Sequence, residues 1–258
     1  MKDLSILKTY YILFITNKIM LPILKNKHIL LPILSEYLSD ITTIVEAGAF
    51  NGTDTIKLAH TWPQAQIHAF EPIPQIYEKL VENTKHLHTV HTYNYALAES
   101  TGNSTFYVSE NPKRPGMPFQ AGSILKPTGR LDWSPITYSH TTTVPTLTIK
   151  DWSQSSGIDS IDIMWLDVQG AAYQVLEGAG ALLRTIKALW IEVEFIQAYQ
   201  DQTQYIELQN WLARQGKVAI LSDASINRTD WFYANVLFVD LQFKSFLDQA
   251  FAPHIIDR

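Results

Sequence analysis

Short apolar runs that lead into acidic residues recur along the chain, and segments of helical length separate them. The run before Glu46 and the run before Glu71 flank a glycine-containing turn and a stretch that favours a helix. Two later runs lead into Asp167 and into Glu192 and Glu194. Strand, helix and strand in this order predict βαβ units, so we expect an open parallel sheet.

The remaining elements complete a fold of the α/β class. A helix is predicted to begin at Pro74, a third strand to cover about 89–95, and an amphipathic helix to span 205–214. Two last strands, 218–221 and 234–239, flank a polar loop. We therefore predict a Rossmann-like, seven-stranded, mostly parallel sheet with an antiparallel last strand.

The stretch 110–143 interrupts this pattern. It holds five of the twelve prolines and three of the eleven glycines, so we expect no long regular element there. Its aromatic residues favour an ordered loop over a substrate cleft, with Ser123 as a candidate substrate contact; a surface ornament is the alternative. Residues 144–147 are predicted as a short edge strand, because Pro145 lacks a backbone N–H.

The first turn carries the candidate binding chemistry. Gly48 and Gly52 let a ligand approach the backbone, and the carboxylate of Glu71 is placed to accept hydrogen bonds from an adenosine ribose. The dinucleotide fingerprint would need glycines where Phe50 and Thr53 stand. We therefore predict a smaller adenosine ligand without a pyrophosphate, such as S-adenosylmethionine. A turn with no ligand is the alternative.

The candidate cofactor residues lie at the predicted carboxyl ends of the strands, where open α/β sheets bind ligands. They are Glu46, Gly48, Ala49, Asn51, Gly52, Glu71, Pro72, Asn94, Ala96, Asp167 and Val168. Asn94 and Ala96 are expected near the base. Asp167 is expected to hold an ammonium group or to face the substrate, and its alternative role is a helix cap.

Residues 1–40 are predicted to form a separate helical arm, followed by the main domain at 41–258. Lys8 and Lys18 interrupt its apolar run, which is then far too short to cross a bilayer, and Asp3 argues against a cleaved signal peptide. Residues 1–30 carry a net charge of +4, which leaves −9 for the remainder. The arm is expected to pack on the domain or on a second subunit. Alternatively, it lies on an anionic membrane surface or forms a lid over an apolar substrate.

Composition narrows the function classes. The 258 residues are 46% hydrophobic and 17% charged, as in globular proteins, and contain no cysteine, which excludes disulfides and thiolate chemistry. The net charge of −5 argues against nucleic-acid binding. No histidine–carboxylate cluster stands out, so we predict no metal. We expect a cytoplasmic protein, with peripheral contact at the inner face of a membrane if the arm binds lipid.

Four sequence blocks, in this order, resemble the FkbM family of S-adenosylmethionine-dependent methyltransferases. They are VEAGAFNG at 45–52, AFEPIP at 69–74, VPTLT at 144–148, and LDVQG at 166–170 with VLEG at 175–178. They are similar to the family's D-x-G-A-x-x-G, F-E-P-x-P, V-x-x-x-T-L-D and I-D-V-E-G-x-E-x-x-V-L-x-G. The resemblance covers about residues 41–240 and implies a class I methyltransferase fold.

The resemblance also implies methyl transfer, most often to a hydroxyl of a sugar, glycolipid or polyketide. It places Glu71 on the cofactor ribose. Three positions depart from the family pattern: Glu46 replaces Asp, Gln169 replaces Glu, and Ala172 stands where a second Glu is common. Because of the last two changes, the family's substrate and catalytic rate cannot be assumed for this chain.

The sequence does not identify one catalytic base. His140 is a candidate, with an exposed bystander as its alternative, and Asp167 is the other candidate. Gln169, Glu192 and Glu194 are candidate contacts to the acceptor.

Two other function classes compete with an enzyme of this kind. A non-catalytic scaffold, recruited by the arm to a membrane-bound biosynthetic complex, would fit the loss of the two carboxylates. A nicotinamide-dependent oxidoreductase is disfavoured by Phe50.

Overall fold

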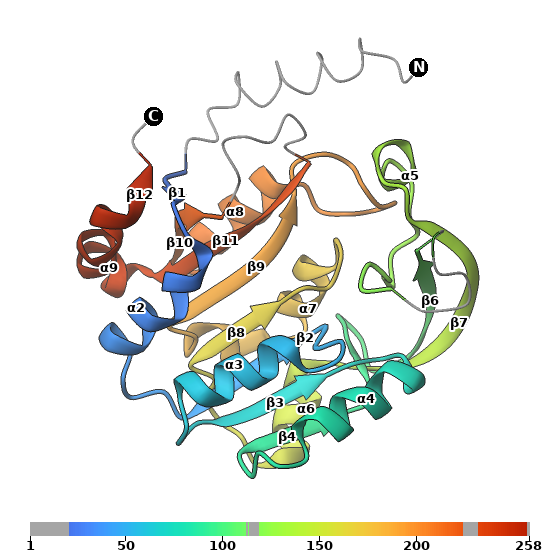
Figure 1. Ribbon diagram of the computed structural model, residues 1–258, viewed down its shortest axis with the longest axis horizontal. Helices are drawn as coiled ribbons and strands as arrows, with labels where there is room; N and C mark the ends of the chain where they lie inside the picture. Colours follow the sequence, from blue (N-terminus) through green and yellow to red (C-terminus); the bar gives the residue numbers. More distant parts are fainter. Residues whose placement is uncertain (1–20, 112, 114–118, 224–231, 257–258) are drawn as a thin grey trace.

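The computed structural model describes residues 21–111, 113, 119–223 and 232–256 and contains a nine-stranded central sheet (Figure 1). Its order is β12-β1-β10-β11-β9-β8-β2-β3-β4. The bounds are β1 (Ile23–Leu24), β2 (Thr43–Ala47), β3 (Gln66–Phe70), β4 (Val90–Tyr93), β8 (Ile163–Leu166), β9 (Ala188–Glu194), β10 (Lys217–Ser222), β11 (Tyr233–Asp240) and β12 (Ile255–Ile256).

Seven of these strands form the predicted core of the sheet. β4, β3, β2, β8 and β9 are parallel, whereas β11 lies antiparallel between β9 and β10. This order, with the last of the seven strands inserted antiparallel, is that of class I methyltransferases. The predicted fold class is confirmed. Sequence reasoning missed the two-residue strands β1 and β12, which extend the sheet beyond β10.

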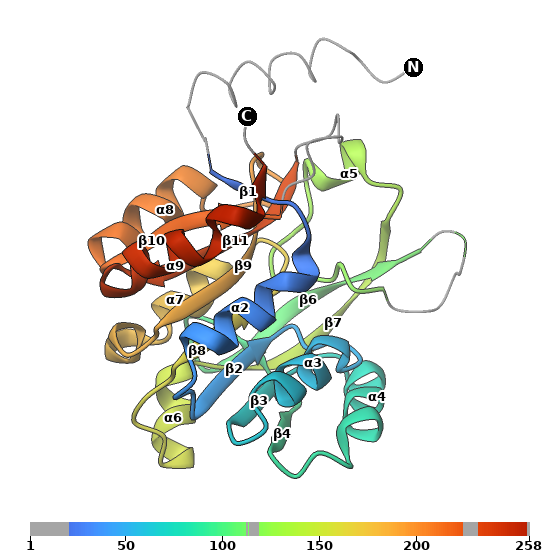
Figure 2. The ribbon, with the colours of Figure 1, turned by 60° about the vertical axis from the view of Figure 1, so that its left-hand side comes forward.

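Helices cover both faces of the sheet. One face carries α2 (Leu30–Tyr37), α3 (Thr53–Thr61) and α9 (Lys244–Phe251), and Figure 2 shows α2 and α9 side by side in front of the strands. The other face carries α6 (Ile149–Ser156), α7 (Ala172–Glu177) and α8 (Tyr205–Arg214). The helix α4 (Pro74–Thr84) packs on β4 and begins at Pro74, as predicted.

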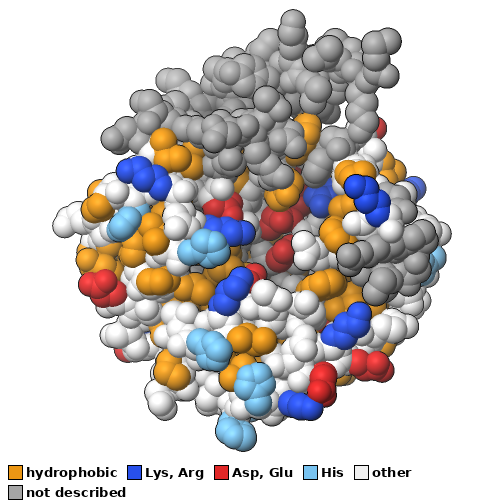
Figure 3. Space-filling model, viewed as in Figure 1, with side chains coloured by type: hydrophobic (Ala, Val, Ile, Leu, Met, Phe, Trp, Pro, Cys, Tyr) orange, Lys and Arg blue, Asp and Glu red, His pale blue; other side chains and the backbone are white. Residues whose placement is uncertain are grey.

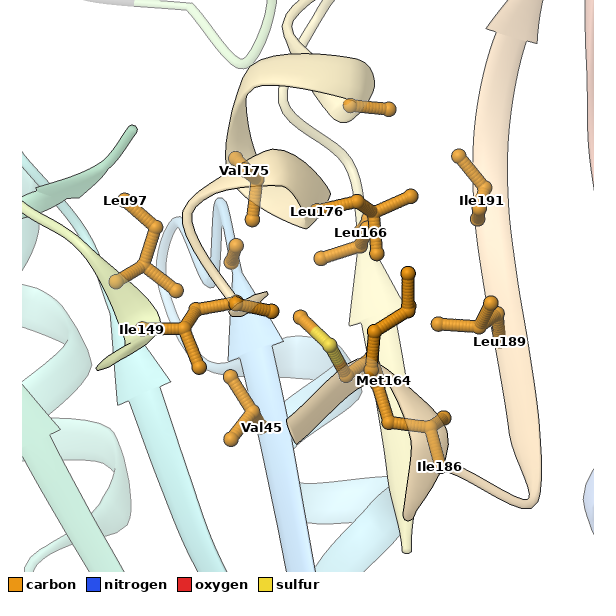
Figure 4. Close-up of a cluster of buried hydrophobic side chains, with 14 of the residues drawn as sticks. Val45, Leu97, Ile149, Met164, Leu166, Val175, Leu176, Ile186, Leu189 and Ile191 are labelled. Atoms are coloured by element: carbon orange, nitrogen blue, oxygen red, sulfur yellow. The ribbon is translucent and has the colours of Figure 1, made fainter. Parts of the chain in front are cut away.

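The central strands β8 and β9 are buried on both faces, which explains their almost continuous apolar sequence. Met164 and Leu166 point to the α7 side and meet Leu189 and Ile191 of β9 (Figure 4). Trp190 belongs to the cluster on the opposite face, where its ring lies 5.6 Å from that of a neighbouring tryptophan, Trp165. The sheet therefore lies between two hydrophobic clusters, one on each of its faces.

A second sheet corrects the prediction for the proline-rich stretch. It has the order β5-β7-β6, with β5 (Ala96–Leu97), β6 (Gly102–Glu110) and β7 (Thr137–Leu147). The expectation of no long regular element was therefore wrong for 137–143, where a run rich in the β-branched residue threonine favours a strand. The edge-strand prediction was also wrong, because β7 is central. Pro145 pairs with β6 only, and the pairing with β5 begins at Thr146.

The rest of that stretch returns along β6 and includes the short helix α5 (Arg130–Trp133). The backbone N–H of Tyr107 donates to the Ser123 carbonyl at 2.8 Å, and the Ser123 N–H donates back at 3.2 Å. Residues 119–124 are thereby held beside β6.

The described part of the predicted arm, residues 21–40, packs on the domain. Leu24 lies in the short strand β1, while Leu30 and Leu34 of α2 are buried against the sheet. The apolar run in residues 1–20 lies outside the described residues, so its partner stays a prediction. Among the residues that the structure describes, no helix has the length and apolar character that a membrane crossing requires.

The buried position of Leu189 predicts a large effect of its truncation. Leu189→Ala removes a fully buried side chain between two packed layers, so we expect the free energy of unfolding to fall by about 2–5 kcal/mol. Urea unfolding measures this change. Leu241→Ala is the matched control, because Leu241 is 59% exposed. Equal losses in the two variants would contradict this account of the core.

Candidate active site

A cavity of about 220 Å³ lies at the carboxyl ends of β2, β3 and β8. Its walls come from the turns that follow these three strands, from residues 95–97, from β6, and from residues 119–124. The space-filling view shows acidic side chains gathered in a hollow at the centre of this face (Figure 3). The cavity is thus at the sheet edge where the sequence predicted ligand binding.

The turn after β2 approaches the turn after β8 so closely that only glycine fits. Gly48 has a φ of 81°, and a Cβ placed there would lie 2.0 Å from the Asp167 carbonyl oxygen. The backbone N–H groups of Gly48 and Ala49 both donate to the Phe70 carbonyl at 3.0 Å. The turn is therefore fixed to its two neighbouring strands, and its backbone lines the cavity.

Glu71 joins the first turn to the second. One carboxylate oxygen accepts the backbone N–H of Phe50 at 3.0 Å, and the other accepts that of Ile73 at 2.9 Å. Burial raises the pKa of Glu71 to about 7, although both N–H groups act in the opposite direction. Each oxygen keeps lone pairs beyond the one that is used, so the carboxylate is oriented and still able to accept hydroxyl donors.

Glu46 and Asp167 are the other acidic groups that the sequence predicted here, and both line the cavity. Thr55 donates its hydroxyl to Glu46, yet burial still raises the pKa of Glu46 to about 8. Burial also raises the pKa of Asp167, to about 6, while a hydrogen bond from Gln169 lowers it. Glu46 is therefore mainly protonated at neutral pH, and Asp167 is mainly ionised.

A polar network extends from Asp167 away from the cavity. The amide nitrogen of Gln169 donates to Asp167 at 2.6 Å and also to Glu192, and the Tyr199 hydroxyl donates to the Gln169 amide oxygen at 3.2 Å. Glu194 accepts from Gln202 at 3.0 Å. Apart from Asp167, none of the residues of this network lines the cavity.

A comparison with known protein families supports this geometry. The family model described as the methyltransferase FkbM domain matches residues 46–219, which include both turns and the acidic ends of β8 and β9. The chain belongs to the methyltransferase FkbM domain family. The resemblance seen in the sequence is confirmed, and with it the expectation of a methyltransferase domain that uses S-adenosylmethionine.

Individual relatives of this FkbM domain are distant. The chain is 27% identical over 160 residues to the 2-O-methyltransferase NoeI of Sinorhizobium fredii (strain NBRC 101917 / NGR234), a match over 62% of this chain and 66% of that protein. Among solved structures, it is similar to methyltransferase FkbM from Methylobacillus flagellatus KT, with 14% identity, a TM-score of 0.49, and coverage of 77% of this chain and 44% of that one. It is also similar to an rRNA methylase from Streptococcus thermophilus, with 13% identity, a TM-score of 0.49, and coverage of 83% of this chain and 96% of that one.

The residues of the FkbM domain fit its cofactor. The close approach at Gly48 leaves a cradle of bare backbone, and Glu71 presents an oriented carboxylate beside it. Of the predicted cofactor residues, the cavity wall brings together Glu46, Gly48, Ala49, Asn51, Glu71, Pro72, Ala96, Asp167 and Val168. Adenosine needs such a combination of an apolar wall and a ribose acceptor.

Three predicted site residues lie elsewhere. Gly52 is the N-cap of α3 with a φ of 85°, and it is not a wall residue. Asn94 donates its amide to the carbonyls of Glu71 and Pro72, so it shapes the second turn instead of contacting the cavity. His140 is on β7 with an exposed side chain, 3.1 Å from Glu110. The structure thus gives no support to His140 as a base.

The predicted acceptor contacts also stand back from the wall. Ser123 donates its hydroxyl to the Gln169 backbone carbonyl at 2.7 Å, although its neighbours Gly122 and Ile124 line the cavity. Glu192 and Glu194 lie on β9, behind Asp167. Direct contact of these residues with an acceptor stays a prediction.

Sequence reasoning missed much of the apolar wall. The missed wall residues include Phe50, Leu97, Phe106 and Val108, whereas Phe119 is one of the aromatic residues that were expected over the cleft. The alternation of buried residues along β6 was a usable signal for Phe106 and Val108, which lie two positions apart on one face. Asp54, in the first turn of α3, was missed as well. In the described residues, no group of histidines and carboxylates could hold a metal ion.

The raised pKa of Glu46 predicts an unusual pH dependence of stability. Its ordinary pKa is 4.5 and its folded-state pKa is about 8, so between these values the folded state keeps a proton that the unfolded state releases. Stability therefore falls as the pH rises from 4.5 to 8. Between pH 5.5 and pH 8 we expect the wild type to lose about 3 kcal/mol more than Glu46→Gln. Urea unfolding at both pH values measures it, with the exposed Glu78→Gln as control. Equal losses in wild type and Glu46→Gln would contradict the assignment.

The close approach at Gly48 predicts a second effect. Gly48→Ala introduces both a strained φ and a clash with the Asp167 carbonyl, whereas Gly157→Ala introduces the strained φ alone, since nothing lies within 4 Å of that position. We expect Gly157→Ala to cost about 1 kcal/mol of unfolding free energy and Gly48→Ala several times more. Thermal unfolding compares the two variants. Similar losses would mean that the two turns have room to separate.

Proposed function

We propose that this protein is an S-adenosylmethionine-dependent methyltransferase that acts on a hydroxyl of a small molecule, such as a sugar, a glycolipid or a polyketide-like acceptor. The observation that carries the proposal is the cavity between the Gly48 turn and the Glu71 carboxylate, in a chain that belongs to the FkbM family. The name of the relative NoeI, a 2-O-methyltransferase, favours oxygen as the methyl acceptor.

The residues of the cavity have separate tasks in this proposal. The bound cofactor supplies an activated methyl group. Glu71 accepts hydrogen bonds from the ribose hydroxyls, while the bare backbone at Gly48 leaves room for the methionine part. The apolar residues Phe106, Phe119 and Ile124 close the wall opposite the sheet, so they exclude water and hold the reactants in line.

Asp167 is the group proposed to take the proton of the acceptor hydroxyl. It lines the cavity, and its pKa of about 6 makes it mainly ionised at neutral pH while leaving it more basic than an ordinary aspartate. The two glutamates of the wall suit this task less well. Glu46 is mainly protonated at neutral pH, and both oxygens of Glu71 already accept backbone N–H groups.

Titration with S-adenosylmethionine in a calorimeter tests the cofactor site. We expect saturable binding by the wild type. Glu71→Ala removes the charged acceptor and should weaken binding by about 2–3 kcal/mol, roughly 30- to 150-fold. Glu78→Ala, an exposed glutamate on the following helix, should bind like the wild type. Absence of binding by well-folded wild type would overturn the proposal.

Transfer of a labelled methyl group to a panel of hydroxylated acceptors then separates an enzyme from a scaffold. Transfer that Asp167→Asn reduces by about 100-fold or more supports the assigned base. Cofactor binding without transfer to any sugar, glycolipid or polyketide acceptor would favour the non-catalytic scaffold. The roles of residues 1–20 at a membrane or a second subunit, and the location of the protein in the cell, stay predictions.

A further inference from the structure

The polar network behind Asp167 is built around one side chain, that of Gln169. Its amide nitrogen donates to a carboxylate oxygen of Asp167 at 2.6 Å and to one of Glu192. The two carboxyl groups are adjacent because Leu166 pairs with Ile191, so the residues that follow them point to the same face of the sheet. A single amide nitrogen therefore bridges two acidic groups that would otherwise face each other.

The orientation of this amide is determined by its surroundings. The Tyr199 hydroxyl donates to the Gln169 amide oxygen at 3.2 Å, which directs the nitrogen toward the carboxyl groups. The Tyr199 ring packs directly on Gly170, where a Cβ would lie 2.6 Å from a ring carbon. The Gln169 backbone carbonyl accepts the Ser123 hydroxyl, and the residue has a φ of 50°. Gln169 is thus held at both its backbone and its side chain.

We propose that Gln169 is a positioning residue for Asp167, whose carboxylate it holds at the cavity wall and separates from Glu192. The inference rests on the proposed function, in which Asp167 faces the cofactor and the acceptor. An amide is suited to this position because it donates to both carboxyl groups at every pH, whereas an ionised glutamate has nothing to donate. The family resemblance places a glutamate here, so this chain has replaced a titratable group with a fixed donor.

The charges of the network follow from this arrangement. Burial and the neighbouring Asp167 and Glu194 raise the pKa of Glu192 well above its ordinary value. At Asp167 the hydrogen bond from Gln169 opposes the effect of burial, so the proton stays on Glu192 and the negative charge stays at the cavity wall. The other charged groups that act on this pair are Glu46 of β2, Asp54 of α3, Glu71 after β3, Arg130 of α5, Glu194 of β9 and Asp223 after β10.

Carboxyl carbon NMR of the cofactor-free protein, labelled at aspartate, tests the proposal without any activity. Asp167→Asn identifies the Asp167 signal, which we expect to titrate at about pH 6 in the wild type. Gln169→Leu removes the donor, and Gln169→Glu adds a third acidic group, so each should move the Asp167 midpoint upward by about 1 pH unit or more. Gln200→Leu, an exposed glutamine on the loop after β9, is the matched control and should leave the midpoint unchanged.

Tyr199→Phe is a second variant that tests the same proposal if Gln169→Leu does not fold. It removes only the hydroxyl that orients the amide, so the midpoint should move in the same direction by a smaller amount. An unchanged Asp167 midpoint in every folded variant at positions 169 and 199 would overturn the proposal and reduce Gln169 to a packing role.

Calorimetric titration with S-adenosylmethionine between pH 5 and pH 8 extends the test to the cofactor. Because the ligand is cationic, its affinity for the wild type should rise with pH through the Asp167 midpoint, and this rise should move to higher pH in Gln169→Leu. A uniform loss of affinity at all pH values would contradict a positioning role in the cofactor site. If the wild type binds no cofactor while the NMR midpoint still moves, the proposed function fails and the positioning of Asp167 by Gln169 stands.

Discussion

The site depends on the contact between two backbone turns, the one after β2 and the one after β8. Their parallel strands are hydrogen-bonded neighbours, and Gly48 lets the first turn lie directly on the carbonyl of Asp167. This contact fixes the positions of Glu46 and Asp167, because both belong to the same pair of strands. It also leaves a floor of bare backbone, on which a ligand can rest without meeting a side chain.

Buried acidic groups dominate the electrostatics around that floor. Glu46, Glu71, Asp167, Glu192 and Glu194 all have raised pKa values, and burial is the largest cause for each of them. Hydrogen bonds oppose this effect of burial: a threonine hydroxyl donates to Glu46, backbone N–H groups donate to Glu71, and an amide donates to Asp167. The protein keeps a limited negative charge at the cavity wall, where a cationic cofactor of the FkbM family would meet it.

The sequence was sufficient for the parts of the site that follow from local chain geometry. Gly48 and Glu71 were predicted because a turn and a strand end are short-range features, and the strands themselves followed from apolar runs of the right length. His140 was a candidate base from its residue type alone. The structure places it on β7 with an exposed side chain 3.1 Å from Glu110, and no local pattern in a proline-rich stretch reveals how β7 pairs with β6. The role of Gln169 was equally hidden, since its partners Glu192 and Tyr199 are 23 and 30 residues away.

The edge of the central sheet joins segments from the two ends of the described chain. β1, at residues 23–24, pairs with β10 on one side and with β12, at residues 255–256, on the other. A chain synthesised only as far as β11 therefore lacks the strand that covers the outer side of β1. Since β10 is paired with both β1 and β11, such a chain would leave only the outer backbone groups of β1 unpaired, where a chaperone or a strand of another copy of the same chain could bind.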